Sequence, residues 1–95
     1  MRVRWTLAAL NDLDEAVGYI AIDDKDTARD IAIAIKSAAK SLAKLPNRGR
    51  PGLVEGAREL LVPNLPYFFV FLIQNEQVEI LRLMHFARKW PRIVQ

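Results

Sequence analysis

RELLVPNLPYFFVFLIQNEQVEILRLMHFARKWP, residues 58–91, is the stretch that decides the fold of this chain. It holds three β-prone apolar segments in a row, at residues 58–62, 67–73 and 78–84, followed by a basic and aromatic tail. Four-residue breaks separate the segments, and connections this short force neighbouring strands to run antiparallel. The stretch therefore predicts three consecutive antiparallel strands.

The middle segment is apolar on both of its faces, which is unusual for a small sheet with helices on one side. One face carries Tyr67, Phe69, Phe71 and Ile73, and the other carries Phe68, Val70 and Leu72. One interpretation is that loops and tail cover the second face, with Trp90 and Ile93 folding back over it. The other is a standing apolar groove that binds a helix or strand of a partner.

The first half of the chain predicts a strand and then a helical hairpin. Residues 2–6 alternate polar and apolar side chains, and Thr6 is a candidate N-cap for the helix that follows. Asp26 or Thr27, after a polar break, is a candidate cap for the second helix, which should end at Pro46. The apolar stripes recur at spacings of three and four, at Leu10, Leu13, Val17 and Ile20 and then at Ala28, Ile31, Ile35, Ala38, Leu42 and Leu45.

Residues 46–52 contain two glycines and two prolines and are expected to form a loop. The order is then β-α-α-β-β-β, an α+β fold in which the helical hairpin packs on one face of a small, mostly antiparallel sheet. At 95 residues the chain is expected to be one domain, spanning residues 1–95, with a single core.

Composition points to a globular cytoplasmic protein without a membrane span. There is no cysteine, and the longest apolar run is far shorter than the roughly 20 residues of a membrane helix. The net charge of +3 comes from residues 46–95, which hold seven basic and four acidic side chains. The basic tail, with Arg88, Lys89 and Arg92, favours an acidic partner such as nucleic acid, an acidic protein segment or a nucleic-acid enzyme.

The sequence offers few side chains from which a catalytic or metal-binding site could be built. The single histidine, His85, excludes a three-histidine zinc site, no motif for a nucleotide or a nucleophile occurs, and we expect neither metal nor cofactor. Arg58, Arg82, His85 and Arg88 could assemble an RNA-cleaving site, because arginine grips phosphate and histidine moves protons near neutral pH. The alternative is that Arg82 is a solvent-facing strand residue and His85 ends its strand.

The order and spacing of several short motifs resemble the RelE/ParE superfamily of bacterial toxins. They are the helix pattern of residues 10–20, Gly49-Arg-Pro-Gly, Ala57-Arg-Glu-Leu-Leu-Val-Pro, Leu65-Pro-Tyr, and residues 78–91. The resemblance covers nearly the whole chain. It implies the same β-α-α-β-β-β fold, and a cognate antitoxin whose C-terminal segment folds on binding and covers the apolar groove.

The resemblance implies one of two activities: cutting mRNA in the ribosome, as RelE-like members do, or poisoning DNA gyrase, as ParE-like members do. RelE-like members place an arginine directly after the tyrosine of the central strand, where this chain has Phe68. They also tend to carry a tyrosine near the C-terminus, where this chain has Val94, although Arg88 matches a basic nuclease position. These departures favour the ParE-like branch.

The sequence therefore predicts a gyrase-directed toxin of a type II toxin–antitoxin module. The predicted target-binding residues are Arg82, Arg88, Lys89 and Trp90, and the predicted antitoxin-binding residues are Phe68, Val70 and Leu72. The first alternative is a ribosome-dependent mRNA endonuclease with Arg58, His85 and Arg88 as its catalytic residues. The second is a relic that binds antitoxin but is not toxic.

Overall fold

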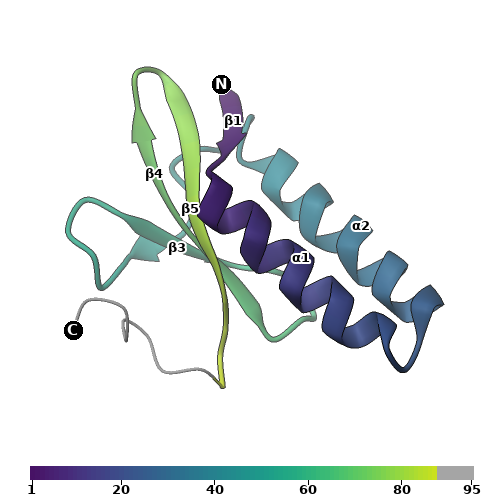
Figure 1. Ribbon diagram of the computed structural model, residues 1–95. Helices are drawn as coiled ribbons and strands as arrows, with labels where there is room; N and C mark the ends of the chain where they lie inside the picture. Colours follow the sequence, from purple (N-terminus) through teal and green to yellow (C-terminus); the bar gives the residue numbers. More distant parts are fainter. Residues whose placement is uncertain (88–95) are drawn as a thin grey trace.

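A computed structural model describes residues 1–87 and shows two helices on one face of a mixed five-stranded sheet (Figure 1). The order is β1 (Arg2–Trp5), α1 (Leu7–Ala21), α2 (Lys25–Ser41), β2 (Arg50–Pro51), β3 (Arg58–Leu61), β4 (Tyr67–Gln74) and β5 (Gln77–His85). The strands lie side by side as β1-β5-β4-β3-β2, and β1 with β5 is the parallel pair among them. The predicted fold, a helical hairpin on a mostly antiparallel sheet, is confirmed.

The helix caps agree with the sequence at α1 and differ at α2. The Thr6 hydroxyl accepts a hydrogen bond from the Ala9 N–H, as expected of an N-cap. The cap of α2 is Asp24, not Asp26 or Thr27, because its carboxylate accepts from both the N–H and the hydroxyl of Thr27. Helix α2 also ends at Ser41, before Pro46, since its last turn tightens into i to i+3 hydrogen bonds.

The main core lies between the hairpin and the sheet. Each predicted stripe includes one exposed residue, Leu10 in the first and Leu45 in the second, and the first stripe omits Ala9, which is fully buried. The buried core residues are Ala9, Leu13, Ile35, Ala39, Leu42, Val62, Tyr67, Phe69, Phe71, Val78, Ile80 and Leu83. The alanines let the two helices approach closely, so the aromatic rings of β4 fill the space beneath them.

The loop expected at residues 46–52 contains a strand that the sequence did not predict. Residues Arg50 and Pro51 form β2, which pairs antiparallel with Glu59 and Arg58 of β3. A two-residue edge strand with a proline has no periodicity to detect. An ion pair between Arg50 and Glu59 joins the two strands.

The two faces of β4 are both buried, and by different parts of the chain. Phe69 and Phe71 pack in the core under the helices. Phe68 and Val70 point to the opposite face of the sheet, called the far face below, and form a second cluster with Ala57 and Met84. Within the described residues, the chain therefore covers Phe68 and Val70 itself, and Leu72 stays partly exposed. Trp90 and Ile93 lie outside the described residues.

A β-bulge in β5 marks the place where α1 takes over from β1 at the sheet edge. Val70 pairs with Arg82 and Phe71 with Ile80, so Leu81 is the extra residue. Beside the bulge, the Thr6 hydroxyl donates to the carbonyls of Ile80 and Leu81. The Thr6 side chain thus forms hydrogen bonds with two β5 carbonyls, at the point where β1 no longer pairs with β5.

Candidate partner-binding site

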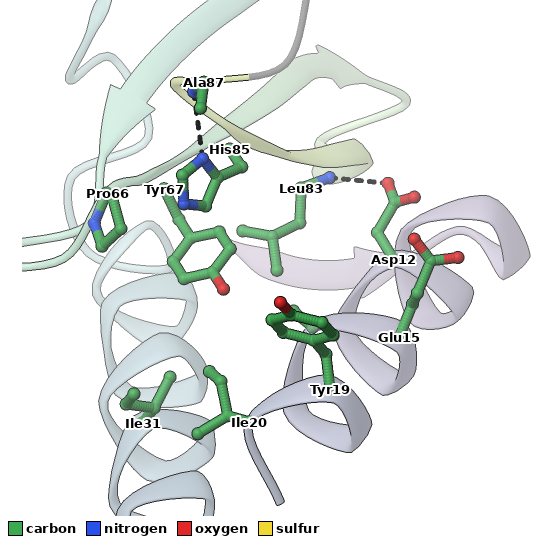
Figure 2. Close-up of a pocket in the computed structure, with 11 residues that line it drawn as sticks. Asp12, Glu15, Tyr19, Ile20, Ile31, Pro66, Tyr67, Leu83, His85 and Ala87 are labelled. Carbon is green, nitrogen blue, oxygen red and sulfur yellow. Dashed lines mark hydrogen bonds between the residues drawn. The ribbon is translucent and has the colours of Figure 1, made fainter. Parts of the chain in front are cut away.

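A hollow near Arg82 and His85 lies between α1, the start of α2 and the ends of β4 and β5 (Figure 2). We call this cavity of about 580 Å³ the helix–strand pocket. Its lining residues are Asp12, Glu15, Ala16, Tyr19, Ile20, Ile31, Pro66, Tyr67, Leu83, His85 and Ala87. Most of these side chains are apolar or aromatic, and the two carboxylates stand on the α1 side.

The α1 contribution follows from helical spacing. Residues 12, 15, 16, 19 and 20 recur at three and four positions and therefore lie on one face of the helix. Tyr19 is 78% exposed and stands at the mouth of the pocket, whereas Tyr67 is 9% exposed and stands within it. The two rings come from different elements, so the pocket has an aromatic wall on either side (Figure 2).

Asp12 fixes one end of the pocket by holding β5. Its carboxylate accepts hydrogen bonds from Nε of Arg82 at 2.7 Å, from Nη2 of Arg82 at 2.9 Å and from the Leu83 N–H at 2.9 Å. The hydrogen bonds that Arg82 donates to Asp12 raise the pKa of Arg82 above its ordinary value, outweighing the effect of burial. Arg82 is therefore engaged inside the domain and is not the solvent-facing strand residue that the sequence left as one alternative.

His85 lies at the other end of the pocket, beside Tyr67. The two rings meet edge to face with centroids 5.1 Å apart. Nδ1 of His85 accepts a hydrogen bond from the Ala87 N–H at 3.0 Å, so the proton of the neutral ring sits on Nε2. These contacts hold the imidazole in place as part of the pocket wall.

The predicted nuclease residues that the structure describes do not meet. Arg58 pairs with Phe71, which pairs with Ile80, whereas His85 pairs with Tyr67. The two levels lie four residues apart along β4, about 13 Å at the rise of a strand. Arg58 instead donates to the carbonyls of Asn47 and Gly49 at 3.2 and 3.5 Å and holds the loop before β2.

Three of the predicted target-binding residues, Arg88, Lys89 and Trp90, lie outside the described residues. The structure places the predicted antitoxin-binding residues Phe68, Val70 and Leu72 on the far face, away from the helix–strand pocket. Their role in binding an antitoxin stays a prediction.

The sequence did not predict Asp12, Tyr19 and Tyr67 as pocket residues. Helical spacing could have grouped Asp12 with Tyr19, but nothing in the sequence shows that this face of α1 meets the end of β5, some 70 residues away. Among residues 1–87, no group of three or more acidic, histidine or cysteine side chains is placed to hold a metal. Neither described helix is long and apolar enough to cross a bilayer.

Comparison with known proteins gives consistent results over nearly the full length. A family model described as the ParE toxin of type II toxin–antitoxin systems, parDE, matches residues 3–90. The protein Y4kP of Sinorhizobium fredii is 42% identical over 93 residues, covering 98% of this chain and 96% of the relative. Toxin RelE2 of Caulobacter vibrioides is 36% identical over 87 residues, covering 92% of this chain and 97% of the relative.

A solved structure with the same fold belongs to a toxin–antitoxin complex. The chain superposes with a TM-score of 0.80 on a chain of the chromosomal ParDE system from P. aeruginosa, at 27% identity. The match covers 90% of this chain and 95% of the other.

Proposed function

Because the chain belongs to the ParE toxin family of type II toxin–antitoxin systems, we propose that it stops growth by poisoning DNA gyrase and that a cognate antitoxin neutralises it. The family match over residues 3–90 carries this proposal. The toxin acts by binding its target, and the helix–strand pocket receives the antitoxin.

The positions of the candidate catalytic groups support action by binding. A nuclease needs a phosphate grip and an acid or base within hydrogen-bond reach of the same atoms. The strand levels of Arg58 and His85 lie about 13 Å apart, and each residue already has a hydrogen-bond partner in the chain. Phe68, at the position after Tyr67, is 7% exposed and supplies no charge.

The composition of the helix–strand pocket supports an antitoxin segment that is apolar and carries basic side chains. Tyr67 and Leu83 form a buried apolar floor, and Tyr19 offers an exposed aromatic ring at the mouth. Arg82 compensates the charge of Asp12, and with Glu15 beside it the rim still holds two acids against one arginine, which favours lysine or arginine in the partner. The pocket fits this role better than the far face, where Phe68 and Val70 are already buried.

The experiment that tests the proposed target is pulse labelling of DNA and protein synthesis after the chain is induced without antitoxin. We expect DNA synthesis to stop first and DNA breaks to appear, since a poisoned gyrase leaves cleaved DNA behind. If protein synthesis stops first and mRNA is cut, the gyrase proposal is wrong and the endonuclease alternative holds. If growth continues at a verified level of the protein, the chain is a non-toxic relic.

A further inference from the structure

A buried carboxylate on the far face of the sheet has no role in the fold's main core or in the helix–strand pocket. Glu59 is 7% exposed and is the buried charged residue among those described. It pairs across the strands with Val70, whose side chain points away from the helices, so Glu59 lies on the same far face. Burial of a carboxylate is costly and persists only where hydrogen bonds compensate it.

Glu59 uses both of its oxygens to organise the segment around β2. Oε1 accepts from Nε and Nη2 of Arg50 at 3.4 and 3.2 Å, and Oε2 accepts from the Leu53 N–H at 3.4 Å. The chain passes so close at Gly52 that an added Cβ would stand 3.1 Å from Cγ of Glu59. The segment at residues 50–53 is therefore fitted onto the Glu59 side chain.

The result of this arrangement is an exposed guanidinium held in a fixed direction. The Arg50 side chain is 67% exposed although it is anchored by a residue that is almost fully buried. Both of its bonds go to one oxygen of Glu59. Among the contacts of residues 1–87, Nη1 of Arg50 has no partner, so its two N–H groups can receive another anion.

Arg50 stands at the edge of a hollow of about 520 Å³ that we call the far-face pocket. Its other lining residues are Pro51, Gly52, Leu53, Glu59, Phe68 and Phe86. Phe86 stacks on Phe68 at 5.8 Å with an angle of 19° between the rings, and 54% of Phe86 remains exposed. Leu53, 68% exposed, adds an apolar rim. A directed cation beside exposed apolar surface is typical of a protein-binding hot spot.

We propose that the far-face pocket is a docking surface for the toxin's target protein, and that it takes a segment presenting a carboxylate next to an apolar side chain. The carboxylate would bind the open edge of the Arg50 guanidinium, and the apolar side chain would pack on Phe86 and Leu53. A nucleic-acid backbone fits less well, because Arg50 is the single cation among the residues that line the pocket, and binding a phosphate backbone depends on several cations.

The inference rests on the proposed function in two respects: the chain acts on a protein target, and the antitoxin occupies the helix–strand pocket. We assign the surface to the target because the antitoxin is assigned to the helix–strand pocket, on the opposite side of the sheet. A target on the far face and an antitoxin on the helix face then contact separate residues of the toxin.

The test compares growth arrest by Arg50→Glu and Leu53→Ser with that by Arg29→Glu, at matched protein levels. Arg29 is the control because it is 70% exposed and lies on α2, so the charge change and exposure match those of Arg50. We expect the first two variants to leave at least tenfold more surviving cells than wild type, and Arg29→Glu to behave as wild type. Circular dichroism of the purified variants checks that each is folded.

Leu53→Ser keeps the test decisive if Arg50→Glu does not fold, since it alters an exposed side chain and leaves the Arg50–Glu59 pair in place. If folded variants arrest growth as strongly as wild type, the proposal that the far-face pocket binds the target is wrong, whatever the target is. Wild type that stops protein synthesis before DNA synthesis overturns the gyrase proposal alone. Variants that lose antitoxin binding and keep full toxicity would reassign the surface to the antitoxin and also overturn the inference.

Discussion

At the scale of single residues, the most informative side chain is Asp12. Its carboxylate joins α1 to β5 through Arg82 and the Leu83 N–H, and these contacts span 70 and 71 positions of sequence. The sequence identified Arg82 and His85 as unusual residues but could not identify their partners. Contacts over such separations depend on how the helix packs on the sheet, and periodicity carries no information about that.

We expect Asp12→Ala to destabilise the domain by about 2 kcal/mol, because it leaves a partly buried guanidinium without its partner. The side chains of Arg82 and Asp12 are 25% and 14% exposed, so solvent compensates only in part. Urea unfolding monitored by circular dichroism measures the loss. Asp14→Ala, an exposed acid on the same helix, is the control and should change stability little; equal effects of the two substitutions would contradict the role given to Asp12.

Asp24, the N-cap of α2, makes the stability of this helix end depend on pH under acidic conditions. The Thr27 N–H, and then the Thr27 hydroxyl, hold the pKa of Asp24 below its ordinary value. Because the pKa of Asp24 is lower in the folded protein, its charged form stabilises the fold. This stabilisation is complete at a pH above the pKa of aspartate in the unfolded chain, about 3.9, and is lost as the pH falls through the pKa of Asp24 in the folded protein. Asp24→Asn keeps a capping oxygen without the charge, so the difference between its melting temperature and that of wild type should shrink as the pH is lowered from 5 to below 3.9. A difference that stays constant over this range would show that the charge contributes nothing.

At the scale of the elements, the existence and type of the long elements could be predicted, whereas their ends could not. Apolar periodicity over residues 7–21 and 25–41 and the three apolar segments after residue 57 were sufficient for the overall order. The end of α2 was misplaced because Pro46 sets a limit to a helix without requiring the helix to reach it. Strand β2 was missed because two residues joined to β3 by an ion pair have no pattern of their own.

The turn of the β4–β5 hairpin offers a substitution that should stabilise the domain. The predicted four-residue turn is a two-residue turn, Asn75–Glu76, with φ of 54° and 57°. Two positive φ values are typical of a type I′ turn, in which glycine is preferred at the second position. Glu76→Gly should therefore stabilise the domain by about 0.5–1 kcal/mol in thermal or urea unfolding. Glu55→Gly, another exposed glutamate, is the control, and a loss of stability in Glu76→Gly would rule out the turn assignment.

At the scale of the whole molecule, the sheet separates two surfaces that differ in chemistry. The helix–strand pocket is apolar with acidic residues on one rim, and the far-face pocket is apolar with the directed cation of Arg50. The doubly apolar β4 segment showed that the second face needs cover, but the sequence left open whether the chain's own loops or a partner supplies it; the structure shows Phe68 and Val70 buried by the chain itself. Which hollows remain open could not be predicted, since this depends on the loop at residues 52–57 that packs Val54 and Ala57 over Val70.

The assignment of the helix–strand pocket predicts a loss of antitoxin binding in Tyr19→Ser. Tyr19 is 78% exposed at the mouth of the pocket, so its removal should weaken binding of the cognate antitoxin at least tenfold, as expected for an aromatic anchor, without unfolding the domain. Ile33→Ser is the matched control, since Ile33 is 60% exposed on α2 and does not line the pocket. Calorimetric titration with the antitoxin measures both. Equal affinities of the two variants would place the antitoxin elsewhere.

Purified components test whether this ParE-family chain poisons gyrase by binding it. Gyrase, ATP and relaxed plasmid are incubated with the antitoxin-free chain, and the DNA products are separated after detergent and protease treatment. We expect loss of supercoiling and accumulation of linear DNA in proportion to the concentration of the chain, both abolished when the antitoxin is added first. Unchanged supercoiling without linear DNA, at concentrations of the chain that cut mRNA on translating ribosomes, would contradict the gyrase proposal.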